Sequence, residues 1–229
     1  MNYLILFFSF LPIFLIGYYY YHKDTVKEPK SLLKNLFFSG ILSAIIVIII
    51  SLITMIFIPN LSNTSNLNKL ELFFYTFIFI AFIEEICKWF MIYKISYNSE
   101  YFDQYFDIVL YSVYVGLGFA CFENLLYIAS SNSALEIAIF RSITAVPAHA
   151  CFQTYMGYFL GNNKFKNYNK KRNMTLSILI PTLLHGLYDY LLLMNNLLFL
   201  IIYIIFIIIL FIITIIKIKN IVKLDKSYL

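Results

Sequence analysis

Seven long apolar stretches decide what this chain can fold into. Each has the length of roughly 20 residues that an α-helix needs to cross the hydrocarbon core of a bilayer. The chain is 62% hydrophobic and 13% charged, against roughly 25% charged in an average soluble domain. The sequence therefore predicts an all-α, polytopic membrane helix bundle. Its seven spans are expected near residues 2–21, 32–58, 70–93, 105–129, 135–160, 174–194 and 197–216.

The basic residues predict an orientation for this bundle. Most of the 17 Lys and Arg residues fall in alternate connections, at 23–34, 94 and 164–172, and in 217–226. Because short basic connections stay in the cytoplasm, we expect the amino terminus outside and the carboxyl terminus inside. This topology and anionic headgroups account for the net charge of +5, so nucleic-acid binding is not expected. The preference for Lys over Arg, with abundant Asn, Ile, Tyr and Phe, is typical of AT-rich coding sequences. We therefore expect a bacterial plasma membrane.

The connections leave no room for a separate soluble domain. We therefore expect one transmembrane domain over residues 1–229, with a basic cytoplasmic tail at 217–229. A phosphate-binding G-x-x-x-x-G-K-[ST] loop does not occur in the sequence, which argues against an ATP-driven function.

Ionisable residues inside the apolar stretches are the strongest functional signal. An isolated charge at the centre of a bilayer costs at least about 2.5 to 3.5 kcal/mol, so these side chains must face one another inside the bundle. They lie on four consecutive spans, the third to the sixth. The set is Glu84, Glu85 and Lys88; Glu123 with Asn124; Arg141 and His149; and His185 and Asp189.

Helical spacing places these residues on shared faces. Glu84 and Lys88 are four residues apart, as are His185 and Asp189, so each pair lies on one side of its helix. Arg141, Ala145, His149 and Gln153 form a stripe with the same spacing, and Pro147 is expected to kink that helix. The prediction is a hydrated pocket at mid-membrane. Buried carboxylates and imidazoles serve both peptide hydrolysis and ion or proton transport, so composition leaves both classes open.

Three short motifs resemble those of one family. "EEICK" from Glu84, "FACFEN" from Phe119 and "HGLYD" from His185 are similar to the E-E-x-x-K, F-x-x-x-E-N and H-x-x-x-D motifs of the PrsW family of intramembrane proteases. These are relatives of the type II CAAX prenyl endopeptidases. Glu123 stands where that branch has histidine, and Lys88 comes one position before its arginine, so the chain resembles the PrsW side.

The resemblance implies glutamate-dependent peptide hydrolysis within a catalytic core at about 70–195. It further implies site-1 cleavage of a membrane-anchored anti-sigma factor in a stress response, with a single-span membrane protein as partner. A CAAX-type prenyl protease and an ion or proton transporter remain the alternatives. The residues that it marks as catalytic are Glu84, Glu85, Glu123, Asn124, His149 and His185, with Lys88, Asp189 and Arg141 in support.

Two versions of the chemistry remain open. In one, Glu84 or Glu85 takes the proton of a water, while His185 and Asn124 stabilise the oxyanion. In the other, Zn²⁺ is held by two carboxylates and two imidazoles, and a water occupies an open position. The expected zinc ligands are Glu85, Glu123, His149 and His185.

Overall fold

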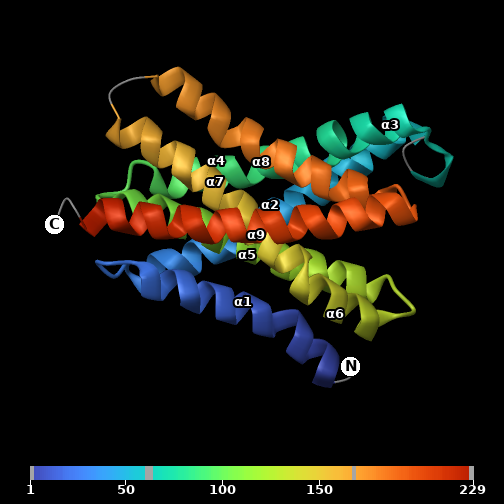
Figure 1. Cartoon of the computed structure of the whole chain (residues 1–229), viewed down its shortest axis with the longest axis horizontal. Coiled ribbons are helices and arrows are strands. Elements are labelled where there is room, and N and C mark those ends of the chain that lie inside the picture. Colours follow the sequence, from blue (N-terminus) through green and yellow to red (C-terminus); the bar gives the residue numbers. More distant parts are fainter. Residues whose placement is uncertain (1–2, 60–63, 167–168, 227–229) are drawn as a thin grey trace.

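The computed structural model describes residues 3–59, 64–166 and 169–226, and every regular element in this part of the chain is helical. The predicted all-α bundle is therefore confirmed (Figure 1). The elements are α1 (Tyr3–Lys23), α2 (Lys30–Phe57), the short turn η2 (Thr64–Asn66), α3 (Lys69–Phe74), the π-helix η3 (Tyr75–Phe82), α4 (Ile83–Ser96), α5 (Tyr105–Ala129), α6 (Ala134–Ile143), α7 (Ala145–Phe165), α8 (Lys170–Leu193) and α9 (Leu197–Lys226).

Six helical segments are long and apolar enough to cross a membrane, and they correspond to six of the seven predicted spans. One of them, Ala134–Phe165, joins α6 to α7. The remaining predicted span, at 70–93, corresponds to α3, η3 and α4, which follow one another without a gap. Helix α9 continues to Lys226, so most of the predicted basic tail extends the last helix; residues 227–229 and Asn2 lie outside the described residues.

Helix α5 is the centre of the bundle. In its apolar window 89% of the residues are buried, against 22% for α1 and for α9. Glycines let its neighbours approach closely: a Cβ added at Gly118 would overlap the carbonyl oxygen of Phe37 on α2. A Cβ at Gly157 on α7 would lie 2.5 Å from the Cα of Val109 on α5. Small residues therefore set the helix spacing around α5, as is common between membrane helices.

The fifth predicted span is interrupted shortly before Pro147, where a kink was expected. Helix α6 ends at Ile143 and α7 begins at Ala145, with Thr144 between them at φ −118° and ψ −66°. Pro147 lies in the first turn of α7, where a backbone N–H would have no partner within the helix. The break places Arg141 and His149 on separate helices.

Candidate active site

Helix α4 supplies the core of the polar site. Glu84, Glu85 and Lys88 lie in its first two turns and are almost fully buried. The Lys88 ammonium donates to Glu84 Oε2 at 3.1 Å and to Glu85 Oε1 at 2.8 Å, as the three- and four-residue spacings predict. The π-helix η3 directly precedes these residues, and such wide turns are often found at functional sites.

Glu85 connects α4 to both α7 and α8. Its Oε2 accepts a hydrogen bond from Gln153 Nε2 at 2.6 Å, and its Oε1 lies 2.9 Å from His185 Nδ1. The other ring nitrogen of His185 lies 3.3 Å from Asp189 Oδ2 and 3.8 Å from Glu84 Oε2. The imidazole of His185 is therefore fixed between carboxylates on α4 and on its own helix.

A second group of contacts surrounds Glu123 on α5 and adjoins the α4 residues. Its Oε2 lies 2.8 Å from His149 Nε2 and accepts from an Arg141 nitrogen at 2.7 Å. Arg141 Nε also donates to Asn124 Oδ1 at 2.7 Å. His149 Nδ1 lies 3.5 Å from Lys88 Nζ, which links this group to α4. One polar network thus runs through α4, α5, α6, α7 and α8.

Aromatic rings close the site on two sides. The Phe119 ring lies 3.8 Å below Lys88 Nζ, so the buried ammonium has a cation–π contact besides its two carboxylates. Phe152 stacks on His185, with ring centroids 5.0 Å apart. Gly186 leaves space for Phe77 of η3, because a Cβ there would lie 2.6 Å from that ring. This contact lets α8 bring His185 up to α4.

Four of the six residues marked as catalytic converge on one point. Glu84, Glu85, His149 and His185 each offer a ligand atom, and these atoms all lie within 4.8 Å of one another. We call these four residues the central cluster. Glu123 contacts the cluster through His149, and Asn124 contacts Arg141 instead. The central cluster thus contains Glu84, whereas the expected zinc ligand set contains Glu123 in its stead.

Two residues outside the marked set also belong to the site. Gln153 donates to Glu85, and Gly116 makes room for its side chain, since a Cβ at Gly116 would overlap Gln153 Cγ. The signal was its position four residues after His149. Phe119, below Lys88, stands at the start of the "FACFEN" motif, four residues before Glu123.

The donor set of the central cluster has the chemistry of a divalent metal site. Two imidazoles and two carboxylates are ligands that Zn²⁺ accepts. The whole network holds the carboxylates of Glu84, Glu85, Glu123 and Asp189 against two permanent cations, Lys88 and Arg141, which leaves two negative charges when both imidazoles are neutral. The ammonium of Lys88 opposes a metal, because it contacts three of the same four side chains.

The network is most accessible on one side. The side chains of Glu123 and Asp189 are 18% and 19% exposed, whereas those of Glu85 and Lys88 are fully buried. Glu123 lies near the carboxyl end of α5 and Asp189 near that of α8. Both helices end there at connections that the basic-residue pattern predicts to lie outside. The exposed edge of the network therefore lies toward the predicted outer end of the bundle.

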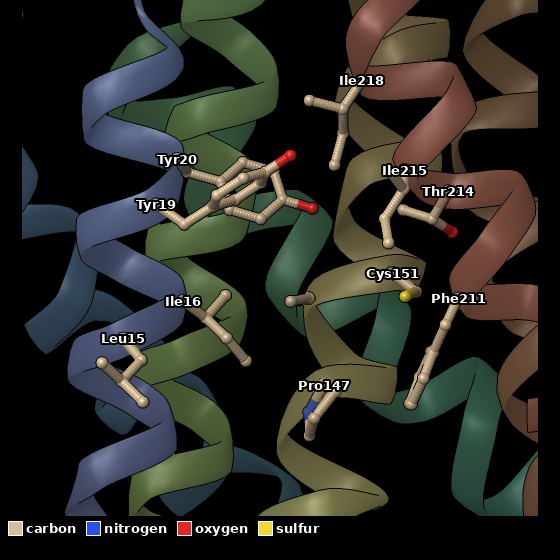
Figure 2. A pocket seen from close by; sticks show the side chains of 11 residues that line it. Leu15, Ile16, Tyr19, Tyr20, Pro147, Cys151, Phe211, Thr214, Ile215 and Ile218 are labelled. Atoms are coloured by element: carbon tan, nitrogen blue, oxygen red, sulfur yellow. The ribbon is translucent and has the colours of Figure 1, made fainter. Parts of the chain in front are cut away.

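An apolar groove elsewhere in the bundle offers no comparable chemistry. Figure 2 shows it between α1 and α9, with Pro147 and Cys151 of α7 at its back. Its volume is about 480 Å³, and its lining contains neither a carboxylate nor an imidazole. The groove lies on the side of α7 away from His149, because Cys151 is about 200° around the helix from that residue. The groove therefore lacks the carboxylates and imidazoles that the polar network combines.

The comparisons with known proteins agree with this geometry. The family described as "PrsW family intramembrane metalloprotease" matches residues 28–215. The chain belongs to the PrsW family. The matched range includes every residue of the polar network, from Glu84 to Asp189. With its six apolar helices, this PrsW family member is a multi-pass membrane protein.

Several curated PrsW proteins are similar to this chain over most of its length. Protease PrsW of Oceanobacillus iheyensis is 36% identical over 174 residues, which are 76% of each chain. Protease PrsW of Clostridioides difficile is 30% identical over 192 residues, or 82% of this chain and 78% of that one. Protease PrsW of Bacillus subtilis is 30% identical over 181 residues, or 79% and 78%. No solved structure gives a significant match.

Proposed function

We propose that the chain hydrolyses a peptide bond of a membrane-anchored protein at the central cluster. The observation that carries the proposal is the convergence of Glu84, Glu85, His149 and His185, from three helices, within 4.8 Å in the bundle interior. Peptide hydrolysis needs a base for the water and donors for the oxyanion, and both kinds of group are present. Membership of a family of intramembrane proteases supports the same reaction.

Glu84 is the better candidate for the general base. Both oxygens of Glu85 are engaged, by Lys88 and His185 on one side and by Gln153 on the other. Glu84 Oε2 pairs with Lys88, whereas its Oε1 makes no hydrogen bond to any described residue. Glu84 takes a proton from the water while the oxygen of that water attacks the scissile carbonyl carbon. It returns that proton to the amine when the C–N bond breaks.

The neighbouring groups stabilise the developing oxyanion and orient the imidazole of His149. Lys88 and His185 present N–H donors beside Glu84, where they stabilise the negative charge that develops on the carbonyl oxygen. Glu123 accepts from His149 Nε2 and so turns Nδ1 of that ring toward Lys88 and the cluster. Arg141 and Asn124 in turn hold Glu123 in place.

The family description names metalloproteases, and the donor set supports that version. When bound by Glu84, Glu85, His149 and His185, a divalent cation such as Zn²⁺ would activate the attacking water and polarise the scissile carbonyl. It would also balance the two negative charges that the network carries beyond Lys88 and Arg141. In that version Glu84 and His185 serve as ligands, and they give up the water activation and the oxyanion stabilisation that they provide without the cation.

As substrate we propose a single-span anti-sigma factor, cut at site 1 near the outer face of a bacterial plasma membrane. The PrsW resemblance supports the substrate class, and the accessible side of the network supports the direction of approach. Asp189 and Glu123, the more exposed residues of the network, lie toward the predicted outer end. A substrate segment leaving the membrane there would reach the cluster without crossing the bundle.

Co-reconstitution tests the proposal. The purified chain is placed in liposomes with a single-span anti-sigma factor, and the cleaved fragments are identified by mass spectrometry. We expect one cut on the outer side of the substrate's span for the wild type and none for Glu84→Gln. The matched control is Glu136→Gln, which changes an exposed glutamate on α6 in the same chemical way.

Two outcomes would contradict the proposal. Cleavage by Glu84→Gln at the rate of the control would remove the central cluster from the reaction. A substrate cut only in its cytoplasmic part would leave hydrolysis in place and overturn the proposed direction of approach.

A further inference from the structure

A second group of buried carboxylates lies at the opposite end of the bundle from the accessible side of the active site. Asp24 and Glu28 belong to the connection between α1 and α2, and Asp107 lies in the first turn of α5. Each offers a carboxylate oxygen, and these oxygens lie within 4.8 Å of one another. The exposed fractions are 4%, 6% and 0%. We call these three residues the acidic triad; the proposed hydrolysis does not use it.

Much of the hydrogen-bonding capacity of the acidic triad is unused. Three side-chain oxygens lack a hydrogen-bond partner among the described residues: both oxygens of Asp24 and Oδ1 of Asp107. The backbone amides of residues 25, 26 and 28 face Asp24, but none reaches hydrogen-bond geometry. Buried carboxylate oxygens without partners are costly, and a bound water or ion commonly satisfies such atoms.

The engaged oxygens of the triad are held in fixed positions. Asp107 Oδ2 accepts from the backbone N–H groups of Asp103 at 3.0 Å and Gln104 at 2.6 Å, which caps α5. Glu28 Oε2 accepts from the Tyr111 hydroxyl at 2.5 Å. These bonds fix two of the three carboxylates from the α5 side.

The triad has no ion-pair partner among the described residues. In the described part of the chain, no Lys, Arg or His nitrogen lies within ion-pair distance of the three carboxylates. The two nearby lysines donate to backbone oxygens instead, Lys27 to Tyr21 and Asp24, and Lys164 to Phe102. Burial raises the pKa of Asp24 to about 6 and that of Glu28 to about 7, because these carboxylates lose hydration.

A cavity borders the chain segments that carry the triad. A cavity of about 640 Å³ at this end of the bundle is bordered by Val26, which lies between Asp24 and Glu28 in the chain, and by Gln104. Asp103 and Asp225 also line the cavity, with Lys166 as the one basic residue among the residues that line it. The cavity is therefore acidic on balance, which favours the approach of a cation.

We propose that the acidic triad binds a divalent cation of the hard class, Mg²⁺ or Ca²⁺. Three carboxylates without a nitrogen or sulfur donor are the ligands that these ions prefer, and Mg²⁺ completes its shell with water. Mg²⁺ is the expected ion, because the basic-residue pattern predicts that this end of the bundle is cytoplasmic. The ion joins the α1–α2 connection to the start of α5, so binding stabilises the folded bundle.

Thermal unfolding of the full-length chain in a neutral detergent tests the site. Protein freed of metal by chelation is titrated with MgCl₂ or CaCl₂ up to 10 mM. For saturation at about 100 times Kd, we expect Tm to rise by about 5 °C or more for the wild type. Asp24→Asn removes a charge and no hydrogen bond, so it should abolish this rise and raise Tm in the absence of metal. Glu28→Gln, which can still accept from Tyr111, should also weaken the rise.

The controls separate this site from other effects. Glu100→Gln removes an exposed carboxylate in the connection that precedes Asp107 and should leave the rise intact. His149→Ala with His185→Ala removes both imidazoles of the central cluster and should also leave it intact, so this test is independent of the proposed hydrolysis. An equal rise in Asp24→Asn and in the wild type, or no rise with either ion, would overturn the proposal.

Discussion

Glu84 and Glu85 are adjacent and both buried, yet their contacts predict different consequences when each is changed to glutamine. Glu85 has contacts to Lys88, Gln153 and His185, and its side chain is fully buried. Glu84 is 8% exposed in its side chain and has its main contact with Lys88 alone. The first substitution should therefore damage both structure and chemistry, and the second mainly chemistry.

The magnitudes follow from these contacts. In Glu85→Gln, the new amide N–H group must face a donor on Lys88, His185 or Gln153. Breaking a buried ion pair in this way costs about 3 kcal/mol. We take the lower end of the usual range because Glu84 still pairs with Lys88. This corresponds to a fall in Tm of about 6 to 12 °C for a chain of this size. Glu84→Gln should cost about half as much. Loss of the base should lower kcat by about 10² to 10⁴.

The chain provides its own probe for the stability half of the experiment. Trp89 is the only tryptophan, next to Lys88 in sequence, and its Nε1 donates to Ser177 on α8. Its fluorescence during heating reports the separation of α4 from α8, while fragment release from a single-span substrate reports activity. If Glu84→Gln kept a near-normal rate, or unfolded at a lower temperature than Glu85→Gln, the division of roles between the two glutamates would be wrong.

Three further predictions test the metal, the positioning of Glu85 and the helix packing. Exhaustive chelation should abolish cleavage and Zn²⁺ should restore it; full activity after chelation would remove the metal from the mechanism. Gln153→Leu should lower kcat about tenfold with little change in KM, because it removes one charge-assisted hydrogen bond from Glu85, measured as initial cleavage rates over a substrate series. Gly118→Ala should lower Tm by several degrees, because its Cβ meets the backbone of Phe37. Gly17→Ala is the control, since its nearest neighbour would lie at 3.5 Å, and an equal fall in Tm for both variants would contradict the packing argument.

The sequence predicts the class of fold and the faces of the polar helices well, because both depend on short-range periodicity. The i, i+4 pairs of Glu84 with Lys88 and His185 with Asp189 appear at 3.1 and 3.3 Å. The spans predicted at 174–194 and 197–216 leave only two residues between them, and the structure has one of these, Asn195, at φ 43° between α8 and α9. Such features need only the helix repeat and local turn chemistry.

The helix interruptions and the exact contacts between polar side chains could not be predicted from the sequence in the same way. The π-helix η3 arises in an uninterrupted apolar run, "YTFIFIAF", which has no proline or glycine to mark it. Which carboxylate joins the two imidazoles depends on the rotation of α5 against α4 and α7. That rotation is set by contacts between distant residues, such as Gly116 with Gln153, so spacing along one helix does not determine it. Glu123 therefore lies behind His149 although its spacing permitted a place in the centre.

Helix α5 explains why the two acidic groups of the bundle have different chemistry. It carries Asp107 near one end and Glu123 near the other, and it is buried along most of its length. Near Glu123, α5 meets helices that bring Arg141 and His149, so its carboxylate is neutralised and becomes a support for an imidazole. Near Asp107 it meets the α1–α2 connection, α7 and the end of α9, whose Asp225 already caps the α5 backbone. One end of the helix thus gathers imidazoles and fixed cations, which suit hydrolysis, while the other gathers buried carboxylates with no ion-pair partner among the described residues, which suit a hard cation.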